Sequence, residues 1–256
     1  MNVNDKDTEL SRYDAKASLL LENESVESFL RFEIDGVDGV ALPYRAPYIR
    51  YQEIVRQSIA RNCDILEIGS GIGAYSGILI RTGANVVASD ISPKSLEVLK
   101  LRYESSSNLE VKVADMESLP FDDNSFDVIC SVGSLSYGDP ALVLNEIYRV
   151  LRSGGCFICL DSLNHHPIYV MNRWISFFLG KRSRSTISRM PTLNTISLYQ
   201  SKFSSLTVEY FGSLSWLMPL FTRLLGESRS AKMSDRFDSR IEVKYSAYKF
   251  IMIAVK

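Results

Sequence analysis

Short apolar runs alternate with segments of helical spacing through the central part of the chain. Runs this short, bounded by polar or turn-forming residues, are typical of strands buried on both faces of a parallel sheet. They predict strands over residues 64–68, 85–89, 109–114, 126–132 and 156–161. The segments between them predict helices over residues 74–82, 93–103 and 140–151. We therefore expect an α/β fold in which helices cover both faces of a mostly parallel sheet.

The N-terminal part of the chain, residues 1–62, precedes the first of these strands. Residues 1–12 are polar, and we expect them to be disordered or loosely attached. Helical spacing predicts helices over 13–32 and 49–60, and the glycines and prolines between them predict a loop. We interpret this part as a helical lid that folds over a site on the sheet.

The main domain, residues 63–256, changes its pattern after residue 161. Two late segments, 203–212 and 246–255, resemble strands, and we expect them to complete the sheet as an antiparallel hairpin. Two insertions, at about 163–201 and 213–240, carry aromatic and basic residues. We expect these insertions to form the wall of an acceptor site.

The first predicted strand leads directly into a glycine-rich turn, Gly69-Ser70-Gly71-Ile72-Gly73. Glycines at alternate positions let the backbone turn tightly and approach a ligand closely, because they have no Cβ. The spacing is not the G-x-G-x-x-G of dinucleotide-binding proteins, since the third glycine comes one residue earlier. Glu67, two residues before the first glycine, is a poor neighbour for a pyrophosphate but suits a cationic amine.

The segment E-x-G-x-G-x-G resembles the first motif of class I S-adenosylmethionine (SAM)-dependent methyltransferases. Two later segments, 119–127 and 146–155, are similar to those around the fourth strand and before the fifth strand in the small-molecule branch of this superfamily. The resemblance covers about residues 63–161. It implies a Rossmann-like class I methyltransferase sheet, SAM as cofactor, and an enzyme that transfers a methyl group.

The resemblance also implies roles for residues at the predicted strand ends, where ligands of open α/β sheets bind. Glu67 would orient the methionyl ammonium, Asp90 would accept hydrogen bonds from the ribose, and Asp115 would accept one from the adenine amino group. Ile91 and Met116 would enclose the adenine ring. The cofactor site predicted in this way comprises Glu67, Gly69, Ser70, Gly71, Gly73, Asp90, Ile91, Asp115, Met116 and Ser131.

The candidate acceptor residues lie outside these motifs. His165 and His166, the only histidines, follow the predicted fifth strand, and a histidine suits general-base work on a hydroxyl at neutral pH. A substrate-binding or structural role for this pair is the alternative, and neighbouring histidines with no spaced partner acid do not indicate a metal site. The substrate-binding residues that we predict are Tyr44, Arg45, Tyr137, Arg182 and Arg184.

The identity of the acceptor stays open. The C-terminal half, with a basic run over 181–189, is similar to methyltransferases of bacterial surface-polysaccharide biosynthesis. This similarity implies O-methylation of a sugar, in a nucleotide sugar or a lipid-linked glycan. One alternative is N- or C-methylation of a small aromatic or quinone-like metabolite. A second alternative is a protein that binds SAM without catalysis.

Charge and cysteine content limit the binding partners and the cellular compartment that we expect for this protein. A formal net charge of −1 gives no overall attraction to nucleic acid or to an anionic membrane, and we expect no nucleic-acid partner. The sequence has no evident signal peptide or spanning segment, and its four cysteines suit buried thiols in a reducing cytoplasm. We expect a cytoplasmic protein without a metal. Peripheral membrane contact through a lipid-linked substrate and a homodimer are both compatible with the sequence.

Overall fold

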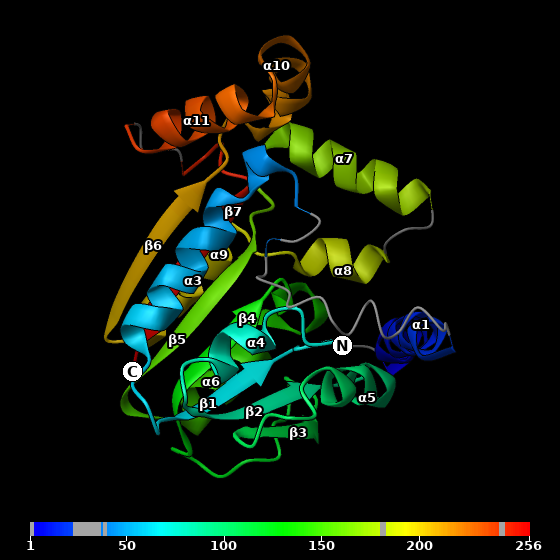
Figure 1. The fold of residues 1–256 in the computed structure, drawn as a ribbon, viewed down its shortest axis with the longest axis vertical. Coiled ribbons are helices and arrows are strands. Elements are labelled where there is room, and N and C mark those ends of the chain that lie inside the picture. Colours follow the sequence, from blue (N-terminus) through cyan, green and yellow to red (C-terminus); the bar gives the residue numbers. More distant parts are fainter. Residues whose placement is uncertain (1–2, 23–36, 38–39, 180–182, 241–243) are drawn as a thin grey trace.

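The computed structural model describes residues 3–22, 37, 40–179, 183–240 and 244–256. A seven-stranded sheet runs through the molecule, and helices pack on both of its faces (Figure 1). This is the mixed, Rossmann-like sheet that the pattern of the sequence predicts. The strands are β1 (Asp64–Ile68), β2 (Asn85–Asp90), β3 (Leu109–Val113), β4 (Phe126–Val132), β5 (Leu151–Ser162), β6 (Ser205–Phe211) and β7 (Lys249–Val255). A further group of helices lies beyond the ends of strands β5 and β6 (Figure 1).

The strand order is β3-β2-β1-β4-β5-β7-β6. Neighbours from β3 to β5 pair in parallel, whereas β7 is antiparallel to both β5 and β6. The expected C-terminal antiparallel pair is therefore confirmed. The chain leaves β1 towards β2 on one side and later returns to β4 on the other side. This reversal creates a crevice at the carboxyl ends of β1 and β4, which is where ligands of open α/β sheets bind.

Helices on each face bury a separate apolar core. On one face, α3 (Ala46–Ser58), α4 (Ser76–Ile80) and α5 (Pro93–Arg102) pack against the sheet. On the other face, α6 (Pro140–Val150) and α9 (Leu193–Lys202) do so. Inner strands such as β1 and β4 are buried on both sides, which explains why their sequences are largely apolar runs, whereas the edge strand β3 alternates apolar and charged residues.

Local signals set where several of these helices begin. The Ser92 hydroxyl accepts a hydrogen bond from the Ser95 backbone N–H at 3.0 Å, and Pro93 follows at the first helical position of α5. This cap satisfies one of the N–H groups that a helix start leaves free. Asp139 caps α6 in the same way. The helix predicted over 74–82 is shorter in the structure, where α4 has only five residues.

Two further sequence predictions were wrong. Residues 3–12 are not loosely attached, because α1 (Val3–Glu22) begins at Val3, and its Glu9 and Ala17 are buried. The second half of the predicted helix 13–32 lies outside the described residues. The strand predicted over 156–161 begins earlier, because β5 starts at Leu151 and contains Gly154 and Gly155, where its register with β4 shifts.

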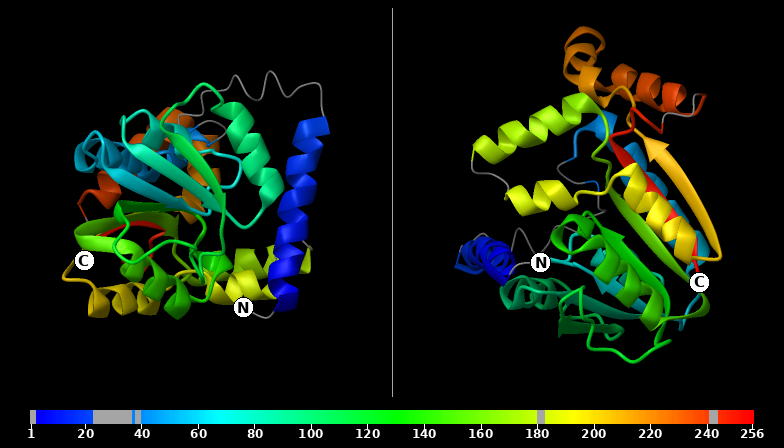
Figure 2. Two further views of the ribbon diagram at one scale, coloured as in Figure 1. Left: turned by 90° about the horizontal axis from the view of Figure 1, so that it is seen from below. Right: turned by 180° about the vertical axis from the view of Figure 1, so that it is seen from behind.

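The two insertions stand at the carboxyl edge of the sheet, beyond β5 (Figures 1 and 2). The first contains α7 (Pro167–Phe178) and α8 (Arg184–Arg189) before α9 returns to the sheet. The second contains η3 (Ser215–Leu217), α10 (Met218–Leu225) and α11 (Glu227–Asp238). A short turn, η1 (Leu42–Tyr44), precedes α3, and another, η2 (Leu135–Tyr137), precedes α6.

Candidate active site

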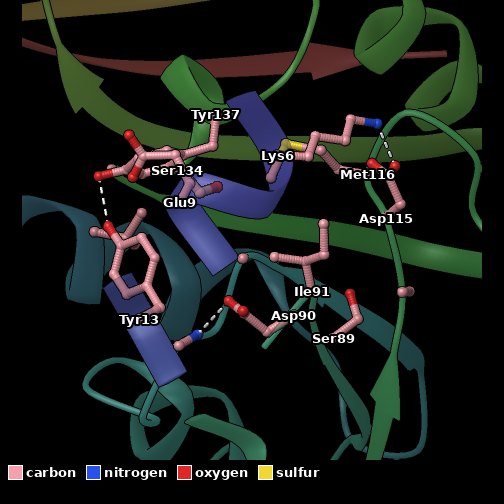
Figure 3. A pocket seen from close by; sticks show the side chains of 15 residues that line it. Lys6, Glu9, Tyr13, Ser89, Asp90, Ile91, Asp115, Met116, Ser134 and Tyr137 are labelled. Atoms are coloured by element: carbon pink, nitrogen blue, oxygen red, sulfur yellow. Dashed lines mark hydrogen bonds and ion pairs between the residues drawn. The ribbon is translucent and has the colours of Figure 1, made fainter. Parts of the chain in front are cut away.

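A cavity lies at the carboxyl ends of β1, β2 and β4, where the strand order reverses (Figure 3). Most of its walls come from the loops that follow these strands and β3. Its remaining wall comes from α1, 50 or more residues away in sequence. The lining residues are Lys6, Glu9, Tyr13, Gly69, Gly71, Ser89, Asp90, Ile91, Ala114, Asp115, Met116, Val132, Gly133, Ser134 and Tyr137.

The glycine turn after β1 forms one wall, and its three glycines have positive φ angles. A Cβ added to Gly69 would lie 2.4 Å from the Ser134 Cβ, and one added to Gly73 would lie 2.8 Å from the Leu99 Cγ. A Cβ added to Gly71 would meet nothing within 4 Å, and Gly71 lines the cavity. Packing therefore requires glycine at two of the positions, whereas the third leaves space that a ligand can enter.

Asp90 ends β2 and closes the same wall. Its Oδ2 accepts a hydrogen bond from the Gly71 N–H at 2.8 Å, and its Oδ1 accepts one from the Ser92 N–H at 2.9 Å. Burial raises the pKa of this carboxyl, although the two backbone N–H groups oppose that shift. The carboxylate thus ties the glycine turn to β2 and keeps lone pairs at the cavity, as a ribose-binding acid would.

The opposite wall contains the acid and the apolar residues that follow β3. Asp115 and Met116 line the cavity there, and Ile91 faces them from the end of β2 (Figure 3). Asp115 forms an ion pair with Lys6, which also lies 2.7 Å from a Glu117 carboxylate oxygen. Burial alone would lower the pKa of Lys6, but the hydrogen bonds to both acids raise it.

Helix α1 crosses the mouth of the cavity. The Tyr13 hydroxyl donates a hydrogen bond to the Tyr137 hydroxyl at 2.5 Å, and the two rings meet edge to face (Figure 3). The Glu9 Oε1 accepts hydrogen bonds from the hydroxyls of Ser183 and Thr186, at 2.7 and 2.8 Å. Lys6, Glu9 and Tyr13 did not emerge from the sequence as site residues, because nothing in a polar N-terminal segment indicates its distant partners.

Two predicted cofactor residues lie beneath the cavity rather than on its surface. The Glu67 side chain is 3% exposed and accepts a hydrogen bond from the Ser76 hydroxyl at 2.5 Å. Burial raises its pKa to about 7, although the bond from Ser76 opposes the shift. Ser131 is also buried, and its hydroxyl lies 2.6 Å from that of Ser134, which does line the cavity. Roles for Glu67 and Ser131 towards the cofactor stay predictions.

The other glycine-turn residues are placed as follows. Gly73 lies behind the turn, where it packs against Leu99 of α5 and against Tyr103, the residue that follows α5. Ser70 is buried, and its hydroxyl has no hydrogen-bond partner among the described residues. Its role likewise stays a prediction.

The predicted acceptor residues divide between two places. Tyr137 lies in the cavity, whereas Tyr44, Arg45 and Arg184 do not line it. Arg45 donates to the Val40 carbonyl at 2.6 Å, Arg184 is exposed on α8, and Arg182 lies outside the described residues. Tyr44 instead packs edge to face on Tyr248, with ring centroids 6.2 Å apart.

An aromatic row leads away from the glycine turn towards the insertions. It begins at Tyr75, whose ring stacks on Tyr48 with centroids 6.0 Å apart. The Lys249 ammonium bridges to the next ring, lying 5.1 Å from the Tyr48 centroid and 5.3 Å from that of Tyr248. Beyond this point the row continues through Tyr169, His166 and Trp216, with centroids 5.6, 5.3 and 6.3 Å apart in turn.

The two histidines differ in their surroundings. His165 is exposed and packs on Tyr245. His166 lies in the aromatic row at the start of α7, and its Nδ1 is buried with no hydrogen-bond partner among the described residues. Of the two, only His166 has a ring nitrogen that is buried without a partner among the described residues.

No group of three or more metal-ligating side chains occurs among the residues that the structure describes. Cys156 and Cys159, which have zinc-pair spacing, are free thiols in β5 and pair with no further ligands. Burial raises the pKa of the Cys156 thiol to about 11. Burial also raises the pKa of Cys159, so the surroundings of both thiols disfavour the thiolate that binds metals.

Comparison with known proteins agrees with this geometry. A family model described as a methyltransferase domain matches residues 66–159, which span β1 to β5 and contain most of the strand-end residues of the cavity. Residues 66–159 are a SAM-dependent methyltransferase domain.

The methyltransferase domain is similar to curated enzymes over part of their length. A demethylmenaquinone methyltransferase of Clavibacter sepedonicus is 34% identical over 116 residues, which is 45% of this chain and 47% of the relative. The chain thus spans about half the length of this relative.

Solved structures share the fold. Phosphoethanolamine N-methyltransferase 2 of Haemonchus contortus, with S-adenosylhomocysteine bound, has a TM-score of 0.56 and 17% identity, covering 84% of this chain and 56% of that chain. The [4+2]-cyclase SpnF has a TM-score of 0.58 and 19% identity, covering 82% and 80%. At such identities, similarity shows the fold alone, and a cyclase among the neighbours illustrates that this fold supports more than one chemistry.

Proposed function

We propose that this chain binds SAM in the cavity and transfers its methyl group to a small-molecule acceptor that enters along the aromatic row. The observation that carries the proposal is the convergence of Gly71, Asp90 and Asp115 on one cavity at the switch point of the sheet. Asp90 suits the ribose and Asp115 suits the adenine amino group of an adenosyl ligand. Gly71, which has no Cβ, lets the ligand approach the backbone closely.

The residues present fit this cofactor. The space beside Gly71 admits the ligand backbone, the Asp90 carboxylate suits the ribose diol, and Ile91 and Met116 offer apolar faces to a purine. When bound, SAM supplies a methyl group made electrophilic by the sulfonium charge. The protein then has to hold the acceptor atom in line with that methyl and exclude water, and α1 over the cavity mouth supports the second task.

A flat, largely apolar acceptor, such as a quinone-like ring, is the class that we favour. Tyrosine rings dominate the row that begins beside the glycine turn, and their faces suit an aromatic or apolar ligand. The curated relative named above acts on demethylmenaquinone. The relative favours C-methylation of a small metabolite over the sugar O-methylation that the C-terminal half of the sequence implies, and the aromatic row suits such an acceptor.

Sugar O-methylation remains the second candidate, because of His166. A sugar hydroxyl needs a general base, and the His166 Nδ1 is buried without a partner among the described residues. Tyrosine and tryptophan rings also pack on sugars, so the aromatic row is compatible with either class. The predicted phosphate-binding role of the basic run has less support, since Arg184 is exposed and does not line the cavity.

The experiment has a binding arm and a turnover arm. Calorimetric titration with SAM tests the cavity, and Asp90→Asn should weaken binding about 10- to 100-fold, the cost of losing a charged acceptor. Asp122→Asn, on an exposed loop side chain, is the matched control. Tight NAD binding without SAM binding would overturn the cofactor assignment.

The turnover arm uses methyl-labelled SAM with a panel of demethylated quinones, nucleotide sugars and lipid-linked glycans. Label on a quinone supports the favoured class, and label only on a sugar supports the second candidate. SAM binding with no label on any class of acceptor would favour a protein that binds SAM without catalysis.

A further inference from the structure

Helix α7 presents an apolar face that none of the described residues covers. Its twelve residues contain a single charged side chain, Arg173. That side chain is buried and donates to the Leu163 carbonyl and the Asn164 side chain, so it contributes no charge to the surface. The large apolar residues left exposed on α7 and just after it are Ile168, Met171, Trp174, Ile175, Phe178 and Leu179.

A second apolar face lies beside the first. Trp216 of η3 stacks on His166 at the start of α7, so the two insertions meet at this point. Figure 1 shows α7 and α10 at the same end of the molecule. The exposed apolar residues here are Trp216, Leu220, Leu224 and Leu225. We call the exposed apolar residues of α7, η3 and α10 the α7–α10 face.

The charge around this face is basic, although the whole chain is nearly neutral. Residues 167–240 contain eleven Lys and Arg and four Asp and Glu, within a chain of net charge −1. Two of these basic side chains lie away from the face, because Arg173 is buried and Lys202 of α9 contacts Asn145, and α11 also exposes Glu227 and Asp235. Several of these basic side chains are exposed on the helices that flank the face. They are Arg184 of α8, Arg223 of α10, and Arg229, Lys232 and Arg236 of α11.

We propose that the α7–α10 face docks on the surface of a bilayer that contains anionic lipids. Helices that lie in a membrane interface combine Trp, Phe and Leu on one face with nearby basic residues, and both features are present here. No described helix is long and apolar enough to cross a membrane. Twelve residues of α7 extend about 18 Å, against a hydrocarbon core of about 30 Å, so this helix would lie along the surface.

The aromatic row gives this docking a use. One end of the row is Trp216, a member of the α7–α10 face, and the other end is Tyr75, beside the glycine turn. A protein that sits on a bilayer with this face down would place the row between the lipid and the cofactor cavity. An acceptor with a hydrocarbon tail could then reach the site while its tail stays in the membrane. Docking itself does not depend on methyl transfer.

The chain carries its own reporter for this contact. Its two tryptophans, Trp174 and Trp216, both belong to the α7–α10 face and are partly exposed. Vesicles of phosphatidylcholine alone and of phosphatidylcholine with phosphatidylglycerol serve as probes. The anionic vesicles should shift tryptophan emission to shorter wavelength, shield both residues from iodide quenching, and carry the protein upward in a flotation gradient. High salt should weaken all three effects, because basic side chains attract the anionic lipids through screened charges.

Two sets of variants separate docking from other roles. Phe178→Glu with Leu179→Glu should reduce binding to anionic vesicles at least about tenfold, whereas Leu142→Glu, at an exposed leucine of α6, should not. Arg229→Glu with Lys232→Glu should reduce binding in a salt-dependent manner and disturbs no apolar packing. Circular dichroism and SAM titration check that each variant is folded.

Three outcomes would overturn the proposal. The wild type could leave anionic vesicles unbound, both sets of variants could bind as the wild type does, or sedimentation could show a dimer that Phe178→Glu with Leu179→Glu dissociates without any vesicle binding. The last outcome would assign the α7–α10 face to self-association. A wild-type protein that does not bind SAM would overturn the proposed function but not the docking.

Discussion

Lys6 of α1 forms an ion pair with Asp115, a residue 109 positions later in the chain that follows β3. The same ammonium contacts Glu117, so one lysine pairs with two acids beside the cavity. This contact fastens the first turns of α1 to the main domain at the place where we expect adenine to bind.

Replacing Lys6 with Ala should loosen α1 and weaken SAM binding. The pair is partly exposed, so its loss should cost about 1 kcal/mol or less, equivalent to no more than about fivefold in the dissociation constant. Faster hydrogen exchange in the first half of α1 should accompany the change. Lys16→Ala, on the same helix at an exposed position, is the control. Unchanged exchange and unchanged affinity in Lys6→Ala would contradict an anchoring role.

The glycine turn permits a test in which backbone strain is matched. Gly71 and Gly154 both have positive φ, and an added Cβ meets nothing within 4 Å at either position, but only Gly71 lines the cavity. Alanine at each should lower the free energy of unfolding by about 1–2 kcal/mol, the cost of a left-handed residue. Only Gly71→Ala should also weaken SAM binding, by at least about tenfold. Equal SAM affinities in the two variants would show that the ligand does not pass beside Gly71.

Glu67 should make stability depend on pH. Its pKa is raised from 4.5 to about 7 by burial, so between these values the unfolded chain releases a proton that the folded chain keeps. The stability contributed by the protonated form is present below pH 4.5 and is lost as the pH rises through 7. Glu67→Gln should therefore gain stability relative to the wild type, on the order of 3 kcal/mol, between pH 4.5 and pH 8.

Urea unfolding of both proteins at several pH values measures this difference. Glu104→Gln, at an exposed position after α5, should show no such trend. A constant difference between Glu67→Gln and the wild type across the range would mean that Glu67 is ionised throughout.

The variants His166→Gln and His165→Gln should differ in their turnover. His166→Gln removes the imidazole whose Nδ1 is buried without a described partner, and turnover should fall about 10²- to 10⁴-fold if this group is the general base. SAM affinity should stay unchanged, because His166 does not line the cavity. His165→Gln is the neighbouring control, at an exposed position. Wild-type turnover in His166→Gln would exclude the general-base role.

The sequence predicts the inner parallel strands well, because strands such as β1 and β4 are buried on both faces and their apolar runs leave little ambiguity. The five parallel strands agree with the structure except at the start of β5, where Gly154 and Gly155 belong to the strand. The strand-end acids Asp90 and Asp115 lie in one cavity because β2 and β3 are parallel neighbours, whose carboxyl ends meet at the same edge of the sheet.

The parts that could not be predicted depend on distant partners. Helix α1 has a polar sequence, and its attachment comes from Glu9 with Ser183 and Thr186, more than 170 residues away. Similarly, the sequence indicates that β4 ends near Ser131, but not that Ser134 is the serine that faces the cavity. Local patterns indicate where elements form, whereas side-chain orientation depends on the assembled structure.

The position of β7 has a consequence for how the protein is made. This strand lies between β5 and β6, although β6 precedes it in the chain by 37 residues. During synthesis β6 leaves the ribosome before the strand with which it pairs. Its backbone N–H and C=O groups have no partner strand until Lys249–Val255 has emerged. Because β7 is the only strand of the described sheet that pairs with β6, β6 can join the sheet only after Lys249–Val255 has been made.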